Sequence, residues 1–272
     1  MKVVMYERYG PPEVLQLQEV EKPVPKEDEV LIRVYATPVE YGDLTARNFR
    51  ALTARSFNMP LLLLLPARLA FGVRRPKIRI LGSAFSGVVE AAGSGVSRFK
   101  AGDELFGYRG ARMGANAEYL CMPERGTVVL KPAALSHAEA AALPYGGIMA
   151  QSLLGRVDIR PGQKVLINGA SGSIGSAAVQ LAKMRGAQVT GVCSSPRLEY
   201  VRALGADAVI DYTQDDFTRS SDRYDLIFDV LGRSSFARCR RVLSPRGRYL
   251  LASFKTKHLL AMLATAFGRG RK

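Results

Sequence analysis

The stretch NGASGSIGSAAVQLAK, residues 168–183, decides the fold. Its glycines stand three apart, at Gly169, Gly172 and Gly175, directly after the apolar run KVLI at 164–167. Glycine adopts backbone conformations closed to other residues and lets a ligand approach the main chain closely. A glycine-rich turn between a buried strand and a helix therefore indicates that a negatively charged group binds at the helix N-terminus.

The sequence around this turn alternates between strand and helix patterns. Apolar runs at 164–168, 188–193, 208–212, 225–230 and 248–253 predict strands, and the segments 173–186, 197–205 and 235–243 predict helices. Such alternation is typical of a doubly wound parallel sheet, the α/β class. The capping-box spacing of Ser136 and Glu139 predicts a further helix that begins after Ser136.

In this context the glycine turn has the features of a dinucleotide-binding loop. The first glycine makes the tight turn, the second admits the pyrophosphate and the third packs the helix on the sheet. The spacing is a variant, G-x-x-G-x-x-G, and the alternative is a turn that serves close packing alone. The residues expected to contact the cofactor are Gly169, Ala170, Ser171, Gly172, Ser173, Ile174 and Gly175.

The end of the second strand favours NADP(H) over NAD(H). An NAD site has an acidic residue about 20 residues after the glycines, which binds the ribose 2′-OH. Here Ser194, Ser195 and Arg197 occupy that place, and no acid lies between Ala187 and Leu198. Hydroxyl groups and a guanidinium suit a 2′-phosphate. Ser195 before Pro196 also fits a helix start, and both interpretations can hold at once.

The first half of the chain has a different pattern. Residues 1–132 contain several short apolar runs separated by turn residues, which predict a β barrel or sandwich. A leucine-rich, helix-like insertion at 53–75 interrupts them. We therefore expect two domains, 1–132 and 133–272.

The net charge of +15 is concentrated in two segments. Residues 47–80 hold eight Arg or Lys and no acid, and residues 255–272 hold five and no acid. The rest of the chain carries 26 basic and 24 acidic residues. Because no aromatic-basic alternation accompanies the charge, nucleic acid is not expected as the main partner.

Cysteine usage and hydropathy favour the cytoplasm. Cys121, Cys193 and Cys239 are odd in number and far apart, which indicates a reducing compartment. The start MKVVMYERYG predicts a strand and turn rather than a signal segment. The longest apolar stretch, 59–73, contains Pro66 and Arg68 and is too short to span a bilayer.

Three stretches resemble the medium-chain dehydrogenase/reductase superfamily, and within it the zinc-free quinone oxidoreductase branch. They are YGPPEVLQLQEVEKPVPKEDEVLIRVYATPV (9–39), ILGSAFSGVVEAAGSGVSRFKAGDELFG (80–107), and VLINGASGSIGSAAVQLAK with GADAVIDY (165–183 and 205–212). The resemblance runs from Met1 to about Phe254. It implies a GroES-like barrel followed by a Rossmann domain, with the active site in the cleft between them.

The chain departs from its zinc-using relatives at the metal positions. Their ligands align here with Glu40, with Ser83 and Ala84, and with Gly146 and Gly147. A catalytic zinc needs three protein ligands and a water, so no metal site is expected. Glu40 near Asp43 leaves a hard-cation site open, with a solvated or salt-bridged pair as the alternative.

Family members continue past residue 272, so the resemblance implies a C-terminally shortened member whose sheet lacks its sixth strand. That puts in question the dimer that similar proteins form through the sheet edge. It also puts in question part of the substrate wall.

Without zinc, a hydrogen-bond donor must stabilise the oxyanion that forms when hydride reaches a carbonyl. The resemblance places PVEYGDLTAR (38–47) at the cleft, where Tyr41 is the candidate proton donor and Tyr145 the second candidate. Asp43 and Arg47 are expected to be structural. The alternative for Tyr41 is a packed barrel tyrosine. Further cofactor contacts are expected from Tyr212 and from the end of the fourth strand, at Val230, Leu231 and Gly232.

The predicted function is a zinc-independent transfer of hydride from NADPH to a lipophilic quinone, enone or related carbonyl. A non-catalytic NADPH-binding sensor or scaffold is the alternative. The insertion has three interpretations. It roofs an apolar pocket with Leu61–Leu65 inward and Arg68, Arg74 and Arg75 outward, it touches an anionic membrane, or it is a plain helix that covers the barrel.

Overall fold

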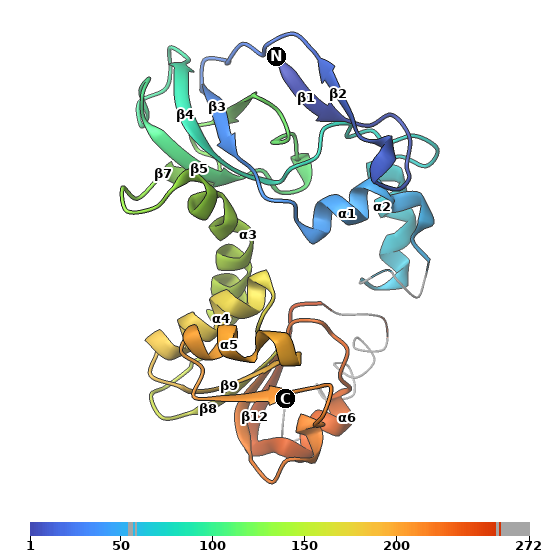
Figure 1. The fold of residues 1–272 in the computed structure, drawn as a ribbon, viewed down its shortest axis with the longest axis vertical. Coiled ribbons are helices and arrows are strands. Elements are labelled where there is room, and N and C mark those ends of the chain that lie inside the picture. Colours follow the sequence, from blue (N-terminus) through green and yellow to red (C-terminus); the bar gives the residue numbers. More distant parts are fainter. Residues whose placement is uncertain (54–56, 58, 254–255, 257–272) are drawn as a thin grey trace. The chain divides into compact units, whose positions relative to one another are not determined.

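The structure, a computed structural model, describes residues 1–53, 57, 59–253 and 256 (Figure 1). Its internal contacts divide the chain into two compact units, Met1–Ser56 with Leu62–Pro144, and Phe57–Leu61 with Tyr145–Lys272. Helix α3 (His137–Leu154) begins in the first unit and ends in the second. The domain boundary predicted at residues 132 and 133 lies just before this helix and stays a prediction.

The first unit is built on antiparallel strands, as its strand-rich sequence predicts. One sheet has the order β6-β3-β4-β5-β7, and β1 pairs with β2 separately. The strands are β1 (Lys2–Met5), β2 (Gln16–Glu19), β3 (Glu29–Ala36), β4 (Ala84–Ala92), β5 (Glu104–Tyr108), β6 (Tyr119–Pro123) and β7 (Val128–Leu130). Val30, Ile32, Phe85 and Leu105 are fully buried between them and form the core of this sheet.

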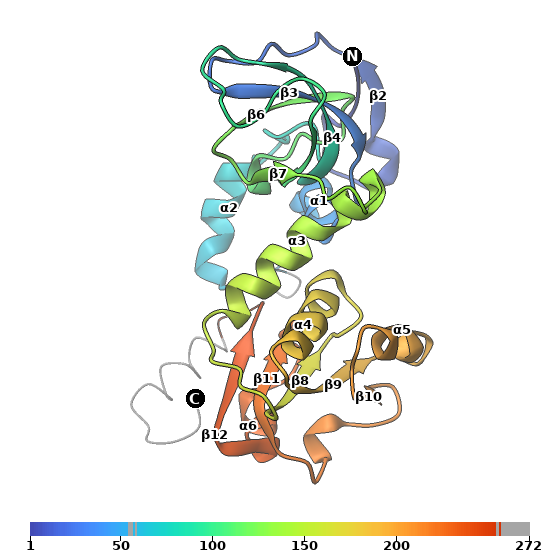
Figure 2. The same cartoon turned by 90° about the vertical axis from the view of Figure 1, so that its left-hand side faces the viewer.

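Short helices cover a second core in this unit, made by Tyr6, Val14, Ala46, Leu81 and Met113. The α-helices are α1 (Tyr41–Arg47) and α2 (Leu64–Phe71), both visible in Figure 2. The 3-10 helices are η1 (Pro12–Val14), η2 (Phe49–Ala51), η3 (Leu61–Leu63) and η4 (Gly110–Arg112).

The second unit contains a five-stranded parallel sheet, which confirms the predicted α/β fold. Its order is β10-β9-β8-β11-β12. The strands are β8 (Lys164–Asn168), β9 (Gln188–Cys193), β10 (Ala208–Asp211), β11 (Tyr224–Asp229) and β12 (Leu243–Leu251). The chain changes direction across the sheet between β8 and β11, and ligands bind at such a switch point outside the carboxyl ends of the strands. The absence of a sixth strand, expected because family members continue past residue 272, stays a prediction, since residues 254–255 and 257–272 lie outside the described residues.

Alternate residues of the central strands face opposite sides of this sheet. Val165 and Ile167 pack with α3, α4 (Ser173–Met184) and α5 (Leu198–Ala203). Leu166 packs on the other side with α6 (Phe236–Cys239), η6 (Phe217–Arg219) and η7 (Arg240–Val242). Because helices cover both faces of this sheet, the sequences of its central strands are unbroken apolar runs.

Two local predictions can be compared with the structure. The capping box is confirmed, because the Ser136 N–H donates to Glu139 Oε2 at 2.8 Å and the Glu139 N–H donates to Ser136 Oγ at 3.2 Å. The helix predicted at 235–243 is shorter than expected. It divides into α6 and η7, and β12 begins early because Leu243 already pairs with Tyr224 of β11.

The insertion does not bury its leucines as the pocket-roof interpretation requires. Leu61, Leu62 and Leu65 are exposed, whereas Arg68 is half-buried and donates to the Leu52 carbonyl oxygen. The outward face of α2 is therefore apolar. None of the helices that the structure describes has the length and apolar character needed to cross a bilayer.

Candidate functional site

The glycine loop lies between β8 and α4, at the switch point of the parallel sheet. Gly169 has a φ of 92°, a conformation that favours glycine. The N–H groups of Gly169 and Ala170 both donate to the Val192 carbonyl oxygen at 3.0 Å, which ties the loop to β9. The loop then turns so that Gly172 caps α4 and Ser173 begins the helix.

Gly175 and Gly172 differ in whether close packing requires a glycine. A Cβ on Gly175 would lie 2.0 Å from the Gly169 carbonyl oxygen, so helix and turn can approach only through a glycine. A Cβ on Gly172 would meet only that oxygen, at 3.6 Å, and the extended φ of −80° is open to any residue. Packing therefore explains Gly175 and leaves Gly172 unexplained. Gly172 is the N-cap of α4, a position that Ser, Thr, Asp and Asn also favour.

The other residues of the loop divide by exposure. Ala170 is fully buried, and Ile174 packs against the core beneath α4. Ser171 is half-buried and Ser173 is exposed at the start of α4. The first N–H groups of a helix have no partner within the helix, so the N-terminus of this 12-residue helix offers donors and a positive dipole end to an anion.

The residues predicted to contact the ribose 2′-phosphate of NADP(H) follow β9. Ser194 is half-buried, Arg197 is exposed, and both belong to the turn around η5 (Ser195–Arg197). The Tyr212 N–H donates to the Cys193 carbonyl oxygen at 3.1 Å, which brings Tyr212 to the same edge of the sheet. The structure thus gathers Ser194, Arg197 and Tyr212 at the carboxyl ends of β9 and β10.

An acidic residue that the sequence analysis missed lies at this edge. Asp211 ends β10, and its Oδ2 accepts the hydroxyl proton of Ser195. Its Oδ1 accepts from the N–H and hydroxyl of Thr213, at 2.9 and 2.7 Å. These bonds hold the pKa of Asp211 below its usual range, with the Ser195 bond as the largest cause. The Ser195 hydroxyl therefore already has an acceptor in Asp211.

The predicted contact residues Val230, Leu231 and Gly232 lie directly beside the glycine loop. The Val230 N–H donates to the Asn168 carbonyl oxygen at 3.1 Å, and a Cβ on Gly169 would lie 3.1 Å from Leu231 Cγ. Leu231 is exposed, and Gly232 has a φ of 60°. The two loops that follow β8 and β11 therefore form one continuous surface.

A buried carboxylate, Asp229, supports that surface and was also missed. It is fully buried at the end of β11 and accepts from Asn168 Nδ2 at 2.9 Å and from the Tyr249 hydroxyl at 2.8 Å. It also accepts from the N–H groups of Gly232 and Ser234, at 3.0 and 3.1 Å. Burial, together with the Asp229 charge, raises the pKa of Tyr249, which therefore stays a donor at neutral pH. The sequence feature that could have identified Asp229 is an acidic residue at the end of an apolar strand.

In the first unit, Tyr41 is the first residue of α1 and its side chain is exposed. The preceding residue, Glu40, accepts from Ser83 Oγ, and burial raises the pKa of its carboxyl. Asp43 is buried and accepts from the N–H groups of Glu40 and Gly82, at 2.8 and 2.9 Å. Arg47 donates to the Gly10 carbonyl oxygen at 3.3 Å. Asp43 and Arg47 thus fix the start and end of α1.

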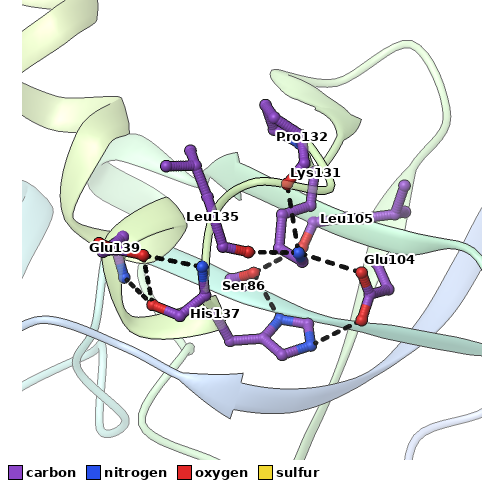
Figure 3. A network of polar contacts seen from close by, with 9 residues as sticks. Ser86, Glu104, Leu105, Lys131, Pro132, Leu135, His137 and Glu139 are labelled. Atoms are coloured by element: carbon purple, nitrogen blue, oxygen red, sulfur yellow. Dashed lines mark hydrogen bonds and ion pairs between the residues drawn. The ribbon is translucent and has the colours of Figure 1, made fainter.

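His137 makes contacts that are structural. His137 Nδ1 lies 2.8 Å from Ser86 Oγ and its Nε2 lies 3.4 Å from Glu104 Oε1. Figure 3 shows both contacts as dashed lines. The His137 ring stacks on Tyr35 at 4.8 Å between centroids. These contacts attach the beginning of α3 to β4 and β5. The other histidine, His258, lies outside the described residues.

Metal-ligating side chains do not converge in the described part of the chain, where no group of three His, Cys, Asp or Glu is placed to hold an ion. Among the aligned zinc positions, Glu40 contacts Ser83 as described above. A Cβ on Gly146 would lie 2.4 Å from the Ser173 carbonyl oxygen, so Gly146 serves the packing of α3 on α4.

Both halves of the chain match known families. Residues 26–133 match the alcohol dehydrogenase GroES-like domain, and residues 173–268 match the zinc-binding dehydrogenase family. A GroES-like domain followed by a parallel dinucleotide-type sheet defines the medium-chain dehydrogenase/reductase class. The chain belongs to the quinone oxidoreductase-like branch of that class.

Individual relatives support this assignment. The chain is 31% identical to a quinone oxidoreductase of Pseudomonas aeruginosa, over 93% of this chain and 73% of the relative. It is 33% identical to a chloroplastic NADPH-dependent alkenal/one oxidoreductase of Arabidopsis thaliana, over 85% of this chain. It spans 58% of the length of that plant relative. The Escherichia coli quinone oxidoreductase complexed with NADPH superposes with a TM-score of 0.74 at 25% identity, over 92% of this chain and 72% of that one.

Proposed function

We propose that this chain binds NADP(H) and transfers its hydride to a lipophilic quinone, enone or related carbonyl without a catalytic zinc. The observation that carries the proposal is Gly172, a glycine that packing does not require, at the N-terminus of a helix that follows the first strand of a doubly wound sheet. The family assignment and the NADPH complex of the E. coli enzyme support the choice of cofactor.

The residues of the second unit fit this cofactor group by group. The N–H groups at the start of α4 suit the pyrophosphate, and Gly172 leaves room for it. Ser194 and Arg197 suit the 2′-phosphate, with Tyr212 beside them. Val230, Leu231 and Gly232 offer a surface next to the loop on which the rest of the dinucleotide can lie.

We expect Arg197→Ala to weaken NADPH binding by ~1–3 kcal/mol, the range for a charge-assisted hydrogen bond. NADH affinity should change little, because NADH has no 2′-phosphate for Arg197 to contact. The unmodified chain should bind NADPH at least about tenfold more tightly than NADH, since the 2′-phosphate would meet both Ser194 and Arg197 and about 1.4 kcal/mol corresponds to tenfold. Calorimetric titration with both nucleotides measures these differences.

Arg223→Ala is the matched control for this experiment. Arg223 directly precedes β11 at the amino edge of the sheet, away from the carboxyl ends that carry the loop, and it donates to the carbonyl oxygens of Ser221 and Asp222. The Arg223→Ala substitution removes the same charge as Arg197→Ala, and it should leave the affinities for NADPH and NADH unchanged. Equal losses of NADPH and NADH affinity in the Arg197 variant would refute the assignment of Arg197 to the 2′-phosphate.

When bound, NADPH supplies the hydride and is left as NADP⁺. The acceptor oxygen gains negative charge and needs a donor and then a proton. We propose the Tyr41 hydroxyl for this role, because it is exposed at the beginning of α1 while Asp43 and Arg47 hold the helix in place. Tyr145 is the second candidate. The polar groups at the aligned zinc positions engage one another, which supports a zinc-independent reaction.

Consumption of NADPH with a panel of lipophilic quinones and enones tests the function. We expect turnover that persists in the presence of a metal chelator and falls about 10²-fold or more in Tyr41→Phe, the range for loss of a general acid. The Kd for NADPH should stay unchanged, because Tyr41 belongs to the first unit. Tyr35→Phe, which alters an exposed tyrosine of β3 that stacks on His137, should retain activity.

The outcomes separate the two function classes. NADPH binding without consumption by any acceptor would support a sensor or scaffold instead of an enzyme. Loss of activity with the chelator would overturn zinc independence. Unchanged turnover in Tyr41→Phe would move the proton donor elsewhere, with Tyr145 tested next. The cytoplasm is the proposed compartment, supported by three cysteines that form no disulfide.

A further inference from the structure

The outward face of α2 is apolar, which is unusual for a surface helix. The exposed fractions are 69% for Leu62, 66% for Leu65, 57% for Leu69 and 55% for Val73. Leu65 and Leu69 stand four apart in α2 and therefore share one face of the helix, while Leu62 precedes them in η3 and Val73 follows the helix end at Gly72. We call these four exposed residues the leucine stripe. Large apolar side chains gathered on one exposed face mark an interaction surface.

The helix is firmly held on its inner side, so the exposed stripe is not the result of a loose segment. Phe71 stacks on Phe49 with 5.0 Å between ring centroids. The Tyr9 hydroxyl lies 2.8 Å from the carbonyl oxygens of Phe71 and Gly72. Arg68 Nη2 donates to the Leu52 carbonyl oxygen at 3.3 Å. The inner face thus satisfies both packing and hydrogen bonds while the leucines point away.

The segment that contains this stripe is basic and has no acidic residue. Residues 47–80 carry eight Arg or Lys and neither Asp nor Glu. Arg50, Arg74 and Arg75 are exposed. A depression of about 350 Å³ beside α2 is lined by Phe49, Arg50, Arg68, Gly72, Val73 and Arg74. Three guanidinium groups around an apolar floor suit a phosphate attached to an apolar body.

We propose that the α2 surface, defined as Leu62, Leu65, Leu69 and Val73 with the exposed Arg50, Arg74 and Arg75, docks on the face of an anionic phospholipid bilayer. The leucine stripe would enter the boundary between head groups and acyl chains, and the arginines would meet the lipid phosphates. An eight-residue helix is only about 12 Å long, so it lies on the bilayer and does not cross it.

Charge and shape disfavour other occupants. A second copy of this surface would bring two clusters of arginine together without acids between them. A nucleic acid would satisfy the arginines but would leave the leucine stripe in water. The bilayer offers both an anionic and an apolar layer. The proposal is independent of the cofactor site, which belongs to the second unit.

Co-sedimentation of the full chain with vesicles tests the proposal. We expect binding to vesicles of phosphatidylcholine mixed with phosphatidylglycerol and little binding to pure phosphatidylcholine. Replacing Arg74 and Arg75 by glutamine should weaken binding roughly 20-fold or more, since each basic residue near an anionic surface contributes about fivefold. Replacing Leu65 and Leu69 by glutamine should weaken it about tenfold or more, although the net charge is unchanged.

Matched controls separate this surface from the attraction of any basic protein to anionic lipid. Arg219→Gln with Arg223→Gln removes two exposed arginines of the second unit, and Met184→Gln removes a methionine that is 82% exposed on α4. Both should bind like the unmodified chain. Unchanged circular dichroism verifies that each variant is folded.

Three results would overturn the proposal. The first is equal weakening by the two arginine pairs, which would show that only net charge matters. The second is unchanged vesicle binding in the leucine pair. The third is a concentration-dependent rise in mass by light scattering that the leucine pair abolishes, which would assign the stripe to a second copy of the chain.

Discussion

Gly172→Ala is expected to weaken NADPH binding at least ~30-fold, or ~2 kcal/mol, the worth of one charge-assisted hydrogen bond to a phosphate. The reason is the geometry of the loop. A methyl group at this position would have only the Gly169 carbonyl oxygen nearby, at 3.6 Å, so the protein itself tolerates it. The methyl would instead occupy the space in which a pyrophosphate reaches the N–H groups of α4.

Folding and binding should separate in this variant. The φ and ψ of Gly172, −80° and 169°, suit alanine, so the free energy of unfolding should fall by no more than about 1 kcal/mol, the cost of a poorer N-cap. Gly147→Ala is the control, because a Cβ there meets nothing within 4 Å and the position is inside α3. It should leave NADPH affinity unchanged. If the Gly172→Ala variant binds NADPH as tightly as the unmodified chain, the glycine at 172 is not needed for cofactor binding.

Asp229→Ala is expected to lower the free energy of unfolding by about 3–5 kcal/mol, a large fraction of a domain's stability. The carboxylate is fully buried and accepts from four donors: Asn168 Nδ2, the Tyr249 hydroxyl, and the N–H groups of Gly232 and Ser234. Alanine leaves all four donors without this acceptor, in a place where water cannot easily replace it. Urea-induced unfolding followed by circular dichroism measures the loss.

The same substitution should also weaken NADPH binding, since two of those bonds hold the loop that contacts Gly169. Asp222→Ala is the control: Asp222 pairs with Lys164 at 2.9 Å, and both side chains are about half exposed. Exposed pairs contribute little, so its effect should stay within about 0.5 kcal/mol. Similar stability of the two variants would contradict the role assigned to the Asp229 network.

The sequence predicted the elements well because each carries a local signal. The glycine loop, the capping box at Ser136 and the apolar runs of the parallel strands depend on residues close together in the chain, and their structures match the predictions. The prediction of a helix at 235–243 was less accurate. There the pairing of Leu243 with Tyr224, a contact distant in sequence, overrides helix propensity and begins the strand early.

The acidic residues of the site could not be predicted from local pattern. Asp211 lies beside Ser195 only because β10 pairs with β9 in a particular register, with Asp211 opposite Cys193. Asp229 meets Asn168 for the same kind of reason, through the pairing of β11 with β8. The segment from Ala187 to Leu198 contains no acid, although a carboxylate from the next strand reaches the same place.

The insertion shows a different limit. Composition correctly indicated a leucine-rich helix with basic neighbours, but it did not decide which side faces the protein. Phe71 and the backbone bonds to Tyr9 fix that orientation, and they turn Leu62, Leu65 and Leu69 outward. The orientation of a short helix depends on such tertiary contacts more than on its own sequence.

Calorimetric titration of the unmodified chain with NADPH and with NADH tests the central claim most directly. The account predicts one NADPH site per chain, with an affinity at least about tenfold higher than that for NADH. No binding of either nucleotide, or a preference for NADH, would contradict it. In the first case the glycine turn would serve packing alone, and in the second Asp211, not Arg197, would set the choice of cofactor.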